Sequence, residues 1–289
     1  MKHGIYYAYW EQQWQADYIP YIEKAARLGF DILEIAASPI PGYSDQKLRE
    51  IRACAAVNGI TLTCGHGPSP SQNIASFDPA VRASALSFYS DLLHRLEKLD
   101  IHLIGGGLYS YWPVDYSKQI DKPGDWGRSV EGVTSISKVA QSCGIQLCLE
   151  VLNRFEGYLL NTAEEAVKFV REVNNPHVKV MLDTFHMNIE EDNIGGAIRQ
   201  TGSLLGHFHT GETNRRCPGK GRIPWHEIGE ALKDINYQGA VVMEPFVRMG
   251  GQVGSDIKIW RDMSQGAEES QLDSDARASL EFSRYVLDS

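Results

Sequence analysis

The sequence alternates short apolar runs with longer amphipathic runs from one end to the other. The short runs are rich in branched and bulky apolar residues, which is typical of strands buried on both faces of a parallel sheet. The longer runs have the spacing of amphipathic helices. Eight such pairs can be counted, with expected strands at residues 4–9, 31–36, 61–67, 101–107, 146–151, 178–183, 205–210 and 240–245.

Helices are expected between these strands, several of them ending at a glycine, which is a common C-terminal stop. Their predicted ranges include 18–29, 44–59, 80–100, 131–144 and 224–235, with a last helix from about 274 to 287. Thr162 and Glu165 have capping-box spacing, so each can accept a hydrogen bond from a free backbone N–H. The segments 109–125 and 246–272 are predicted to be long loops over the mouth of the fold.

Repeated βα units predict a single (β/α)8 TIM barrel, formed by residues 1–289 as one domain. The chain supplies about 36 residues per unit (289 residues over eight units), which fits the usual size of such barrels. A doubly wound open sheet is the alternative, but no GxGxxG motif follows the first strand.

The net charge of −9 disfavours nucleic acid or an anionic membrane surface as a partner, because phosphate binding depends mainly on Lys and Arg. The five cysteines are odd in number and lack zinc-ribbon or C-x-x-C spacing, so a disulfide framework is not expected. The N-terminal segment has no signal-peptide pattern, and no apolar stretch is long enough to span a bilayer. A cytoplasmic location is therefore predicted.

Each of the last four expected strands ends in a side chain that can bind a metal ion: Glu150, Asp183, His209 and Glu244. Parallel strands carry their C-terminal ends on one side of a barrel, so these four should converge there. A purely structural role, such as pairing with Lys179, is the alternative for any single acid. Three carboxylates and one imidazole suit Mn²⁺, Co²⁺ or Mg²⁺ better than a thiolate-bound zinc.

His207 lies two residues before His209, so both point to the same face of the strand. His209 is nearer the strand end and is assigned to the metal. His207 is predicted to be a hydrogen-bonded core histidine one layer lower.

Glu150 and Glu244 should flank the ion, because their strands lie on either side of the two that carry Asp183 and His209. Two facing carboxylates can remove a proton from one face of a carbon and return it to the other face. A divalent cation can acidify such a C–H bond next to a carbonyl. Inversion of a carbon centre through a cis-enediolate follows as a hypothesis.

Polar residues in the loops above the strands could bind a substrate, namely Glu156, His186 and Arg215. Aromatic residues expected at the mouth, Tyr6, Trp14, Trp112 and Phe246, could stack on the C–H faces of a sugar. For Trp14 and Trp112, core packing or a subunit contact is an equal alternative.

The chain resembles the ketose 3-epimerases related to D-tagatose 3-epimerase over nearly its full length. The resemblance is carried by MKHGIYYAYWE, LDIHLIGG, YSYWPVDY, EVLNRFEG, VKVMLDTFHMNIEED, LGHFHTGE, PGKGRIPW and MEPFVRMGGQVGSDIKIWRD. It implies a homodimeric or homotetrameric TIM barrel with one Mn²⁺ or Co²⁺ per subunit, which interconverts the ketohexoses D-psicose (D-allulose) and D-fructose. It further implies that Glu150 and Glu244 exchange the C3 proton.

The resemblance also implies two groups of substrate contacts. Glu156, His186 and Arg215 would bind O1 to O3 of the linear sugar, and Tyr6, Gly107, Trp112 and Phe246 would line the C4 to C6 end. Gly107 stands where members of the family carry Ala, and His66 occupies a position that is often apolar. Both departures leave a preference for D-tagatose and D-sorbose open.

Three other functions are compatible with parts of the pattern. An aldose–ketose isomerase on a similar barrel would move hydrogen between C1 and C2. A metal-dependent nuclease of the endonuclease IV type would need more His and Glu ligands and a basic groove, which the charge of −9 disfavours. A silent sugar-binding protein would not need two facing glutamates.

Overall fold

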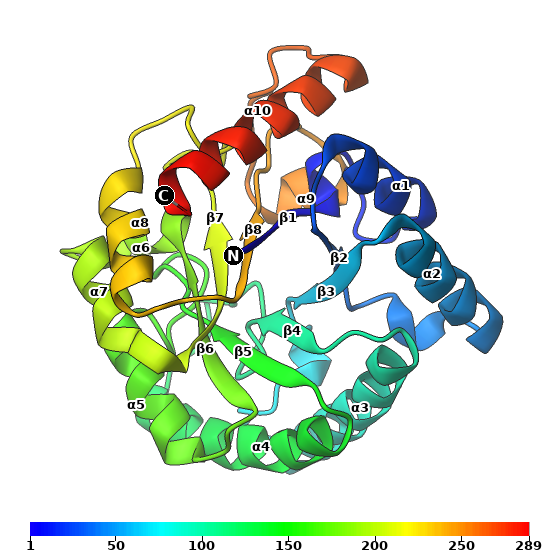
Figure 1. Cartoon of the computed structure of the whole chain (residues 1–289). Coiled ribbons are helices and arrows are strands. Elements are labelled where there is room, and N and C mark those ends of the chain that lie inside the picture. Colours follow the sequence, from blue (N-terminus) through cyan, green and yellow to red (C-terminus); the bar gives the residue numbers. More distant parts are fainter. Residues whose placement is uncertain (289) are drawn as a thin grey trace.

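Eight parallel strands close into a barrel in the order in which they occur in the chain (Figure 1). The computed structural model describes residues 1–288. The strands are β1 (Lys2–Tyr6), β2 (Ile32–Ala36), β3 (Thr61–His66), β4 (Leu103–Gly106), β5 (Gln146–Glu150), β6 (Val178–Asp183), β7 (Leu205–Thr210) and β8 (Ala240–Met243). The predicted TIM barrel is confirmed.

Most of the helices form an outer ring around the barrel (Figure 1). The helices of the described chain are α1 (Ile19–Leu28), α2 (Asp45–Asn58), α3 (Pro79–Lys98), α4 (Lys122–Ser142), α5 (Ala163–Val173), α6 (Thr184–Glu190), α7 (Ile194–Thr201), α8 (Trp225–Asp234), α9 (Gly251–Asp256) and α10 (Glu269–Leu287). None of the helices in the described chain combines the length and apolarity that crossing a bilayer requires.

The helix boundaries follow local capping chemistry. Gly29 and Gly59 end α1 and α2 in the left-handed conformation that glycine adopts without steric cost. At the start of α5, the Thr162 hydroxyl accepts a hydrogen bond from the Glu165 N–H at 3.3 Å. The Glu165 carboxylate accepts from the Asn161 N–H at 2.8 Å. Each of the two predicted capping side chains therefore satisfies a free backbone donor.

Three predicted boundaries are wrong. The first strand ends at Tyr6, and residues 7–9 form a short 3-10 helix instead of continuing it. Helix α4 begins at Lys122 and not near residue 131, because the Asp121 side chain caps it by accepting from the Gly124 N–H. Helix α10 begins at Glu269, and α9 lies within the segment 246–272 that was predicted to be a loop.

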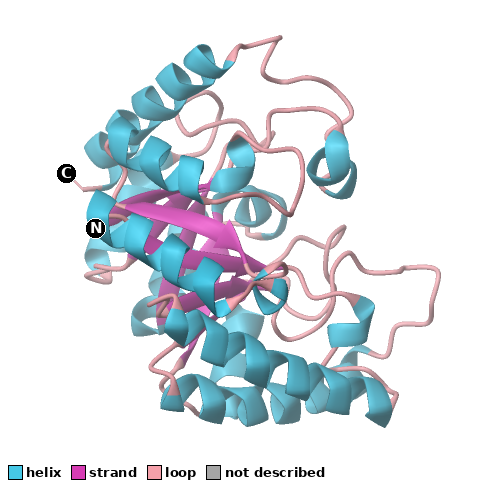
Figure 2. Ribbon diagram, turned by 90° about the vertical axis from the view of Figure 1, so that its right-hand side faces the viewer, coloured by secondary structure: helices cyan, strands magenta, loops and turns pink. Residues whose placement is uncertain are grey.

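The strand ends define one functional side of the barrel. In Figure 2 the arrowheads point to the right, and the longer loops extend beyond the strands on that side. Inside the barrel the packing is tight, since a Cβ on Gly105 would lie 2.5 Å from the Met181 sulfur. The barrel is thus a filled core and not a pore, and its open space lies above the strand ends.

Candidate active site and metal centre

The four predicted ligand residues converge at the C-terminal ends of β5 to β8. Glu150 and Asp183 are the last residues of β5 and β6, His209 is the penultimate residue of β7, and Glu244 directly follows β8. Asp183 and His209 are direct partners in the sheet register. One ligand atom from each of the four side chains lies within 4.8 Å of the others.

The donor atoms of this group fit a divalent cation. His209 Nδ1 lies 3.7 Å from Glu244 Oε1 and 3.9 Å from Asp183 Oδ2. It is buried and has no hydrogen-bond partner within residues 1–288. Asp183 Oδ1 accepts from the Phe185 N–H at 2.6 Å, which leaves Oδ2 for the centre of the group. An unpartnered ring nitrogen buried among carboxylate oxygens is a donor set that a cation satisfies.

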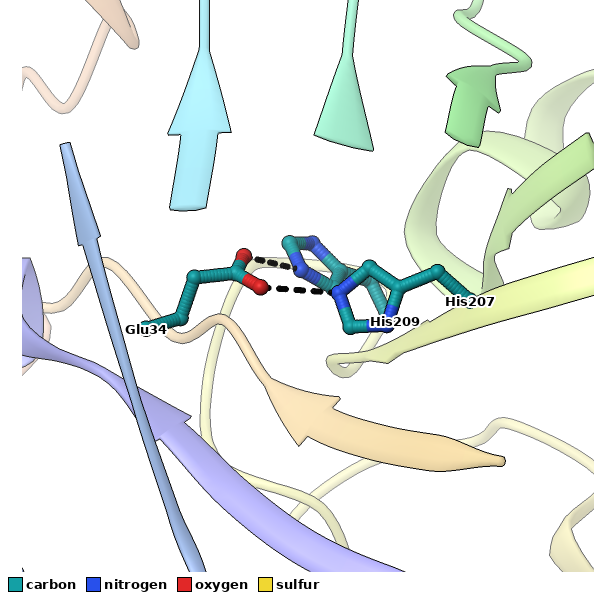
Figure 3. Close-up of side chains that lie close together, drawn as sticks. All are labelled: Glu34, His207 and His209. Carbon is teal, nitrogen blue, oxygen red and sulfur yellow. Dashed lines mark hydrogen bonds and ion pairs between the residues drawn. The ribbon is translucent and has the colours of Figure 1, made fainter. Parts of the chain in front are cut away.

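Glu34, which the sequence reasoning did not single out, holds two histidines below this centre (Figure 3). Its carboxylate is fully buried and lies 2.6 Å from His209 Nε2, 2.8 Å from His207 Nε2 and 2.7 Å from the Thr63 hydroxyl. His207 is therefore a hydrogen-bonded core histidine, as predicted. An acid in the middle of the apolar run at 31–36 was the available signal for Glu34.

Glu34, His207 and His209 also have the spacing of a possible metal site. The contacts favour a hydrogen-bonded group over a metal site, however, because both oxygens of Glu34 accept hydrogen bonds. Burial acts to raise the pKa of Glu34, but the neighbouring His209 and His207 outweigh it and hold this pKa far below its usual value. Glu34 is thus an anion stabilised by three donors.

Glu150 and Asp183, two acids of the predicted ligand group, have pKa shifts in opposite directions. Burial, followed by the nearby Glu244, raises the pKa of Glu150 well above its usual value. Burial also acts to raise the pKa of Asp183, yet His186 and Arg215 outweigh it, and the pKa of Asp183 is lowered. Three carboxylates in one buried group repel one another, and a bound cation would relieve this repulsion.

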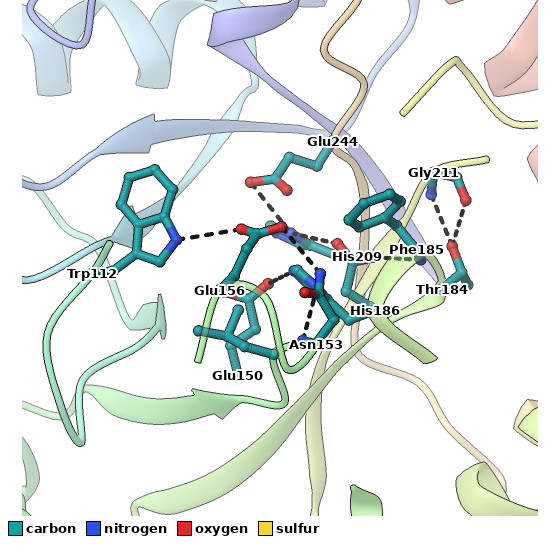
Figure 4. Close-up of polar contacts among 12 residues, drawn as sticks. Trp112, Glu150, Asn153, Glu156, Thr184, Phe185, His186, His209, Gly211 and Glu244 are labelled. Carbon is teal, nitrogen blue, oxygen red and sulfur yellow. Dashed lines mark hydrogen bonds and ion pairs between the residues drawn. The ribbon is translucent and has the colours of Figure 1, made fainter. Parts of the chain in front are cut away.

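Arg215 links the acids of the site, and Figure 4 shows the polar contacts around Glu156, His186 and Glu244. Its Nη1 donates to Glu244 Oε2 at 3.0 Å, and its Nη2 lies 3.4 Å from Glu156 Oε1. Its guanidinium also lies 3.8 Å from the centroid of the Phe185 ring. The side chain is buried, so its position is fixed by these contacts and not by solvent.

The tautomer of His186 is set by Asn153, a second residue that sequence reasoning missed. His186 Nδ1 lies 3.2 Å from the Asn153 backbone N–H and 2.7 Å from its side-chain amide, and it accepts from both. Burial lowers the pKa of His186. The neutral ring therefore carries its proton on Nε2, which lies 3.6 Å from Glu150 Oε1 and faces the site.

A cavity of about 400 Å³ opens above the four ligand residues. All seven predicted substrate contacts line it, namely Glu156, His186, Arg215, Tyr6, Gly107, Trp112 and Phe246. Trp14 also lines it, with edge-to-face contacts to Trp112 and Phe246 at ring-centroid distances of 6.2 and 6.3 Å. The Trp112 indole N–H donates to Glu156 Oε2 at 3.3 Å, so one wall combines an apolar face with a polar anchor.

The two departures from the family pattern, Gly107 and His66, both line this cavity. His66 is buried, its Nδ1 lies 3.3 Å from the Ser38 hydroxyl, and its ring stacks on Phe88. Burial lowers the pKa of His66 to about 4, so the ring is neutral near pH 7. His66 therefore places a polar side chain in the cavity wall but adds no charge to the cavity.

Comparisons with known proteins agree with this geometry. A family model described as "Xylose isomerase-like TIM barrel" matches residues 22–272. D-psicose 3-epimerase of Ruminiclostridium cellulolyticum is 70% identical over 288 residues, covering 100% of this chain and 98% of the relative.

Two solved structures are similar over the whole fold. The D-psicose 3-epimerase with D-tagatose from Clostridium cellulolyticum H10 has a TM-score of 0.99 and 70% identity, covering 99% of each chain. A D-psicose 3-epimerase in the presence of D-fructose has a TM-score of 0.99 and 62% identity, covering 100% of each chain. The chain belongs to the D-psicose 3-epimerase group of the ketose 3-epimerases, within the xylose isomerase-like TIM barrels.

Proposed function

We propose that this protein is a metal-dependent ketose 3-epimerase that interconverts D-psicose (D-allulose) and D-fructose. The observation that carries the proposal is the convergence of Glu150, Asp183, His209 and Glu244 at the floor of a cavity whose size suits a hexose. The similarity to D-psicose 3-epimerases over the full chain supports the same reaction.

In this proposal Glu150, Asp183, His209 and Glu244 hold one divalent ion, Mn²⁺ or Co²⁺, with Mg²⁺ possible. When bound, such an ion polarises a substrate carbonyl and acidifies the neighbouring C–H bond. The unpartnered Nδ1 of His209 and the Oδ2 of Asp183, which lies 3.9 Å from this nitrogen, support this ligand set.

Glu150 and Glu244 are proposed to move the proton at C3 of the open-chain sugar. One glutamate removes the proton to give a cis-enediolate of the sugar, and the other returns a proton to the opposite face. Their surroundings support different roles, because Glu244 Oε2 is held by Arg215 whereas Glu150 Oε1 faces His186 Nε2 at 3.6 Å.

The remaining cavity residues are proposed to orient the substrate. Glu156, His186 and Arg215 would bind O1 to O3, since an N–H donor of His186, a guanidinium and a carboxylate all face the cavity there. Tyr6, Gly107, Trp112 and Phe246 would line the C4 to C6 end, where ring faces exclude water and contact C–H groups.

A preference for D-tagatose and D-sorbose is the second candidate. Gly107 and His66 line the cavity wall and leave this preference open, because the first is small and the second is polar. Rates measured side by side on D-psicose, D-fructose, D-tagatose and D-sorbose, with Mn²⁺ and with Co²⁺, decide between the two candidates. The pair with the highest kcat/KM identifies the preferred substrates.

We further propose that residues 1–289 act as one domain, in the cytoplasm, as a homodimer or homotetramer. Exposed apolar side chains beside the mouth support association of subunits, since Phe155 is 72% and Tyr116 is 46% exposed. A mass measured in solution by light scattering tests this, and a monomer at micromolar concentration would refute it.

The reaction is tested by isotope exchange in D₂O. We expect deuterium at C3 of the recovered sugar with the native protein, and no exchange with Glu150→Gln. Sugar binding, measured by calorimetry, should persist in this variant. Glu230→Gln, an exposed glutamate on α8, is the matched control and should exchange normally. Deuterium at C1 instead of C3 would identify an aldose–ketose isomerase, and full exchange by Glu150→Gln would remove that residue from the chemistry.

A further inference from the structure

Glu34 lies outside the substrate cavity and contacts the proposed metal centre only through His209. Its two oxygens lie against different neighbours (Figure 3). Oε1 is 2.6 Å from His209 Nε2, whereas Oε2 is 2.8 Å from His207 Nε2 and 2.7 Å from the Thr63 hydroxyl. Glu34 and His207 are fully buried, so solvent does not compete for these contacts.

From this geometry we infer that Glu34 is a positioning residue, whose carboxylate fixes the tautomer and the ring orientation of His209. A histidine binds a cation as the neutral ring. Because a carboxylate anion only accepts hydrogen bonds, the one proton of such a His209 ring must lie on Nε2. The lone pair then lies on Nδ1, which is the atom that faces Asp183 and Glu244. The inference rests on the proposed role of His209 as a metal ligand.

The register of the barrel explains why this acid comes from β2. Glu34 is paired with Tyr6 of β1 on one side and with Thr63 of β3 on the other. Its side chain crosses the barrel interior to reach β7, which is not a neighbouring strand. Gly65 of β3 lies beside this carboxylate, since a Cβ there would be in van der Waals contact with Glu34 Oε1 at 3.5 Å.

The same three side chains could be read as a second metal site. The contacts favour a hydrogen-bonded clamp, because each oxygen of Glu34 already accepts from a donor at normal hydrogen-bond distance. A carboxylate that accepts from the distal N–H of a histidine ligand makes the ring more basic and holds it in place. Loss of such a partner typically weakens metal binding by about 10- to 100-fold.

The first test measures Mn²⁺ binding to the metal-free protein by titration calorimetry. Glu34→Gln, which keeps the size of the side chain but removes its charge, should weaken Mn²⁺ binding by about 10- to 100-fold. Thr63→Val is the matched control, because it removes another hydrogen bond to the same carboxylate but leaves the bond to His209; its effect should be small by comparison. With Co²⁺ in place of Mn²⁺, the metal affinities of the native protein and the two variants should rank in the same order.

The outcomes separate this inference from the proposed function. No Mn²⁺ or Co²⁺ binding by the native protein would overturn both. Binding by Glu34→Gln as tight as that of the native protein would overturn the positioning role alone. A second ion per chain that disappears in Glu34→Gln would also overturn it, in favour of a metal site at Glu34.

A second measurement uses only the native fold, so it does not depend on whether Glu34→Gln folds. In the protein loaded with diamagnetic Mg²⁺, nitrogen NMR should show the His209 ring protonated at Nε2, with a slowly exchanging N–H. The signal is assigned by its loss in His209→Gln. A ring protonated at Nδ1 would contradict the inference, because Glu34 could then not be its acceptor.

Discussion

Arg215 combines a strained backbone with a buried charge. Its φ of 63° lies in the left-handed region, which costs a non-glycine residue on the order of 1–3 kcal/mol. Two hydrogen bonds hold it there, from the Arg215 N–H to the Glu212 carbonyl and from the Phe246 N–H to the Arg215 carbonyl, both at 2.9 Å. The loop thereby aims the guanidinium at Glu244 and Glu156.

Arg215→Lys should lower kcat/KM by about 10²- to 10³-fold, the usual loss for one preorganised donor. A lysine keeps the positive charge, but it cannot contact Glu244 and Glu156 together or stack on Phe185. Steady-state kinetics on D-psicose measures the effect, with the exposed Arg222→Lys as the control. A kcat/KM within threefold of the native value would show that a positive charge at position 215 is sufficient for activity.

Two neighbouring glycines should respond in opposite ways to the same substitution. Gly107→Ala should raise the free energy of unfolding by about 0.4–1 kcal/mol, because its Cβ would meet only Pro68 and Leu152, at 3.6 and 3.9 Å. Gly106→Ala should lower it by more than that, because Gly106 has φ of 116° and a Cβ there would overlap the His66 carbonyl oxygen. Urea unfolding of the metal-free variants measures both, and equal effects would contradict this account.

The loop from β7 to α8 is organised by a buried acid, Glu212. Its carboxylate accepts from the Gly219 N–H at 2.8 Å, the Ile223 N–H at 3.2 Å and the Trp225 indole at 2.9 Å. These hydrogen bonds connect separate parts of the loop that carries Arg215, so the loop is held in one conformation. Its rigidity comes from Glu212 and not from regular secondary structure.

Glu212→Gln should destabilise the fold by about 1–3 kcal/mol, because the amide oxygen can serve only two of the three donors and its NH₂ group cannot accept from the third. We also expect a higher KM for D-psicose, because Arg215 loses its fixed position. Urea unfolding and steady-state kinetics test the two effects, with the exposed Glu281→Gln on α10 as the control. An unchanged KM would separate this loop from substrate binding.

At the level of elements, the sequence predicted the strands better than the segments between them. Apolar runs ending in Glu150, Asp183 and His209 identified β5 to β7 together with the residues proposed as metal ligands, because strand length and alternation depend on local sequence. The start of α4 was wrong, because it depends on the Asp121 cap within a segment with weak helical periodicity. Glu34 and Asn153 were not predicted, because their partners, His209 in β7 and His186 in α6, are distant in sequence and only the closed barrel brings them together.

For the whole molecule, the ion is predicted to contribute stability as well as chemistry. Chelation with EDTA should abolish activity and lower the free energy of unfolding, by about 2.7 kcal/mol relative to protein held at a free metal concentration 100 times Kd. Calorimetry and activity before and after Mn²⁺ or Co²⁺ is restored measure both effects. Full activity in the stripped protein would contradict the proposed metal centre.

Asp183 has two tasks at once, since Oδ1 caps α6 through the Phe185 N–H while Oδ2 faces the ligand group. Helix α6 in turn carries His186 into the cavity. A single replacement at position 183 therefore disturbs ion binding and substrate orientation together. Inactivity of such a mutant would not reveal which of the two had failed, whereas Mn²⁺ binding measured directly on the mutant would.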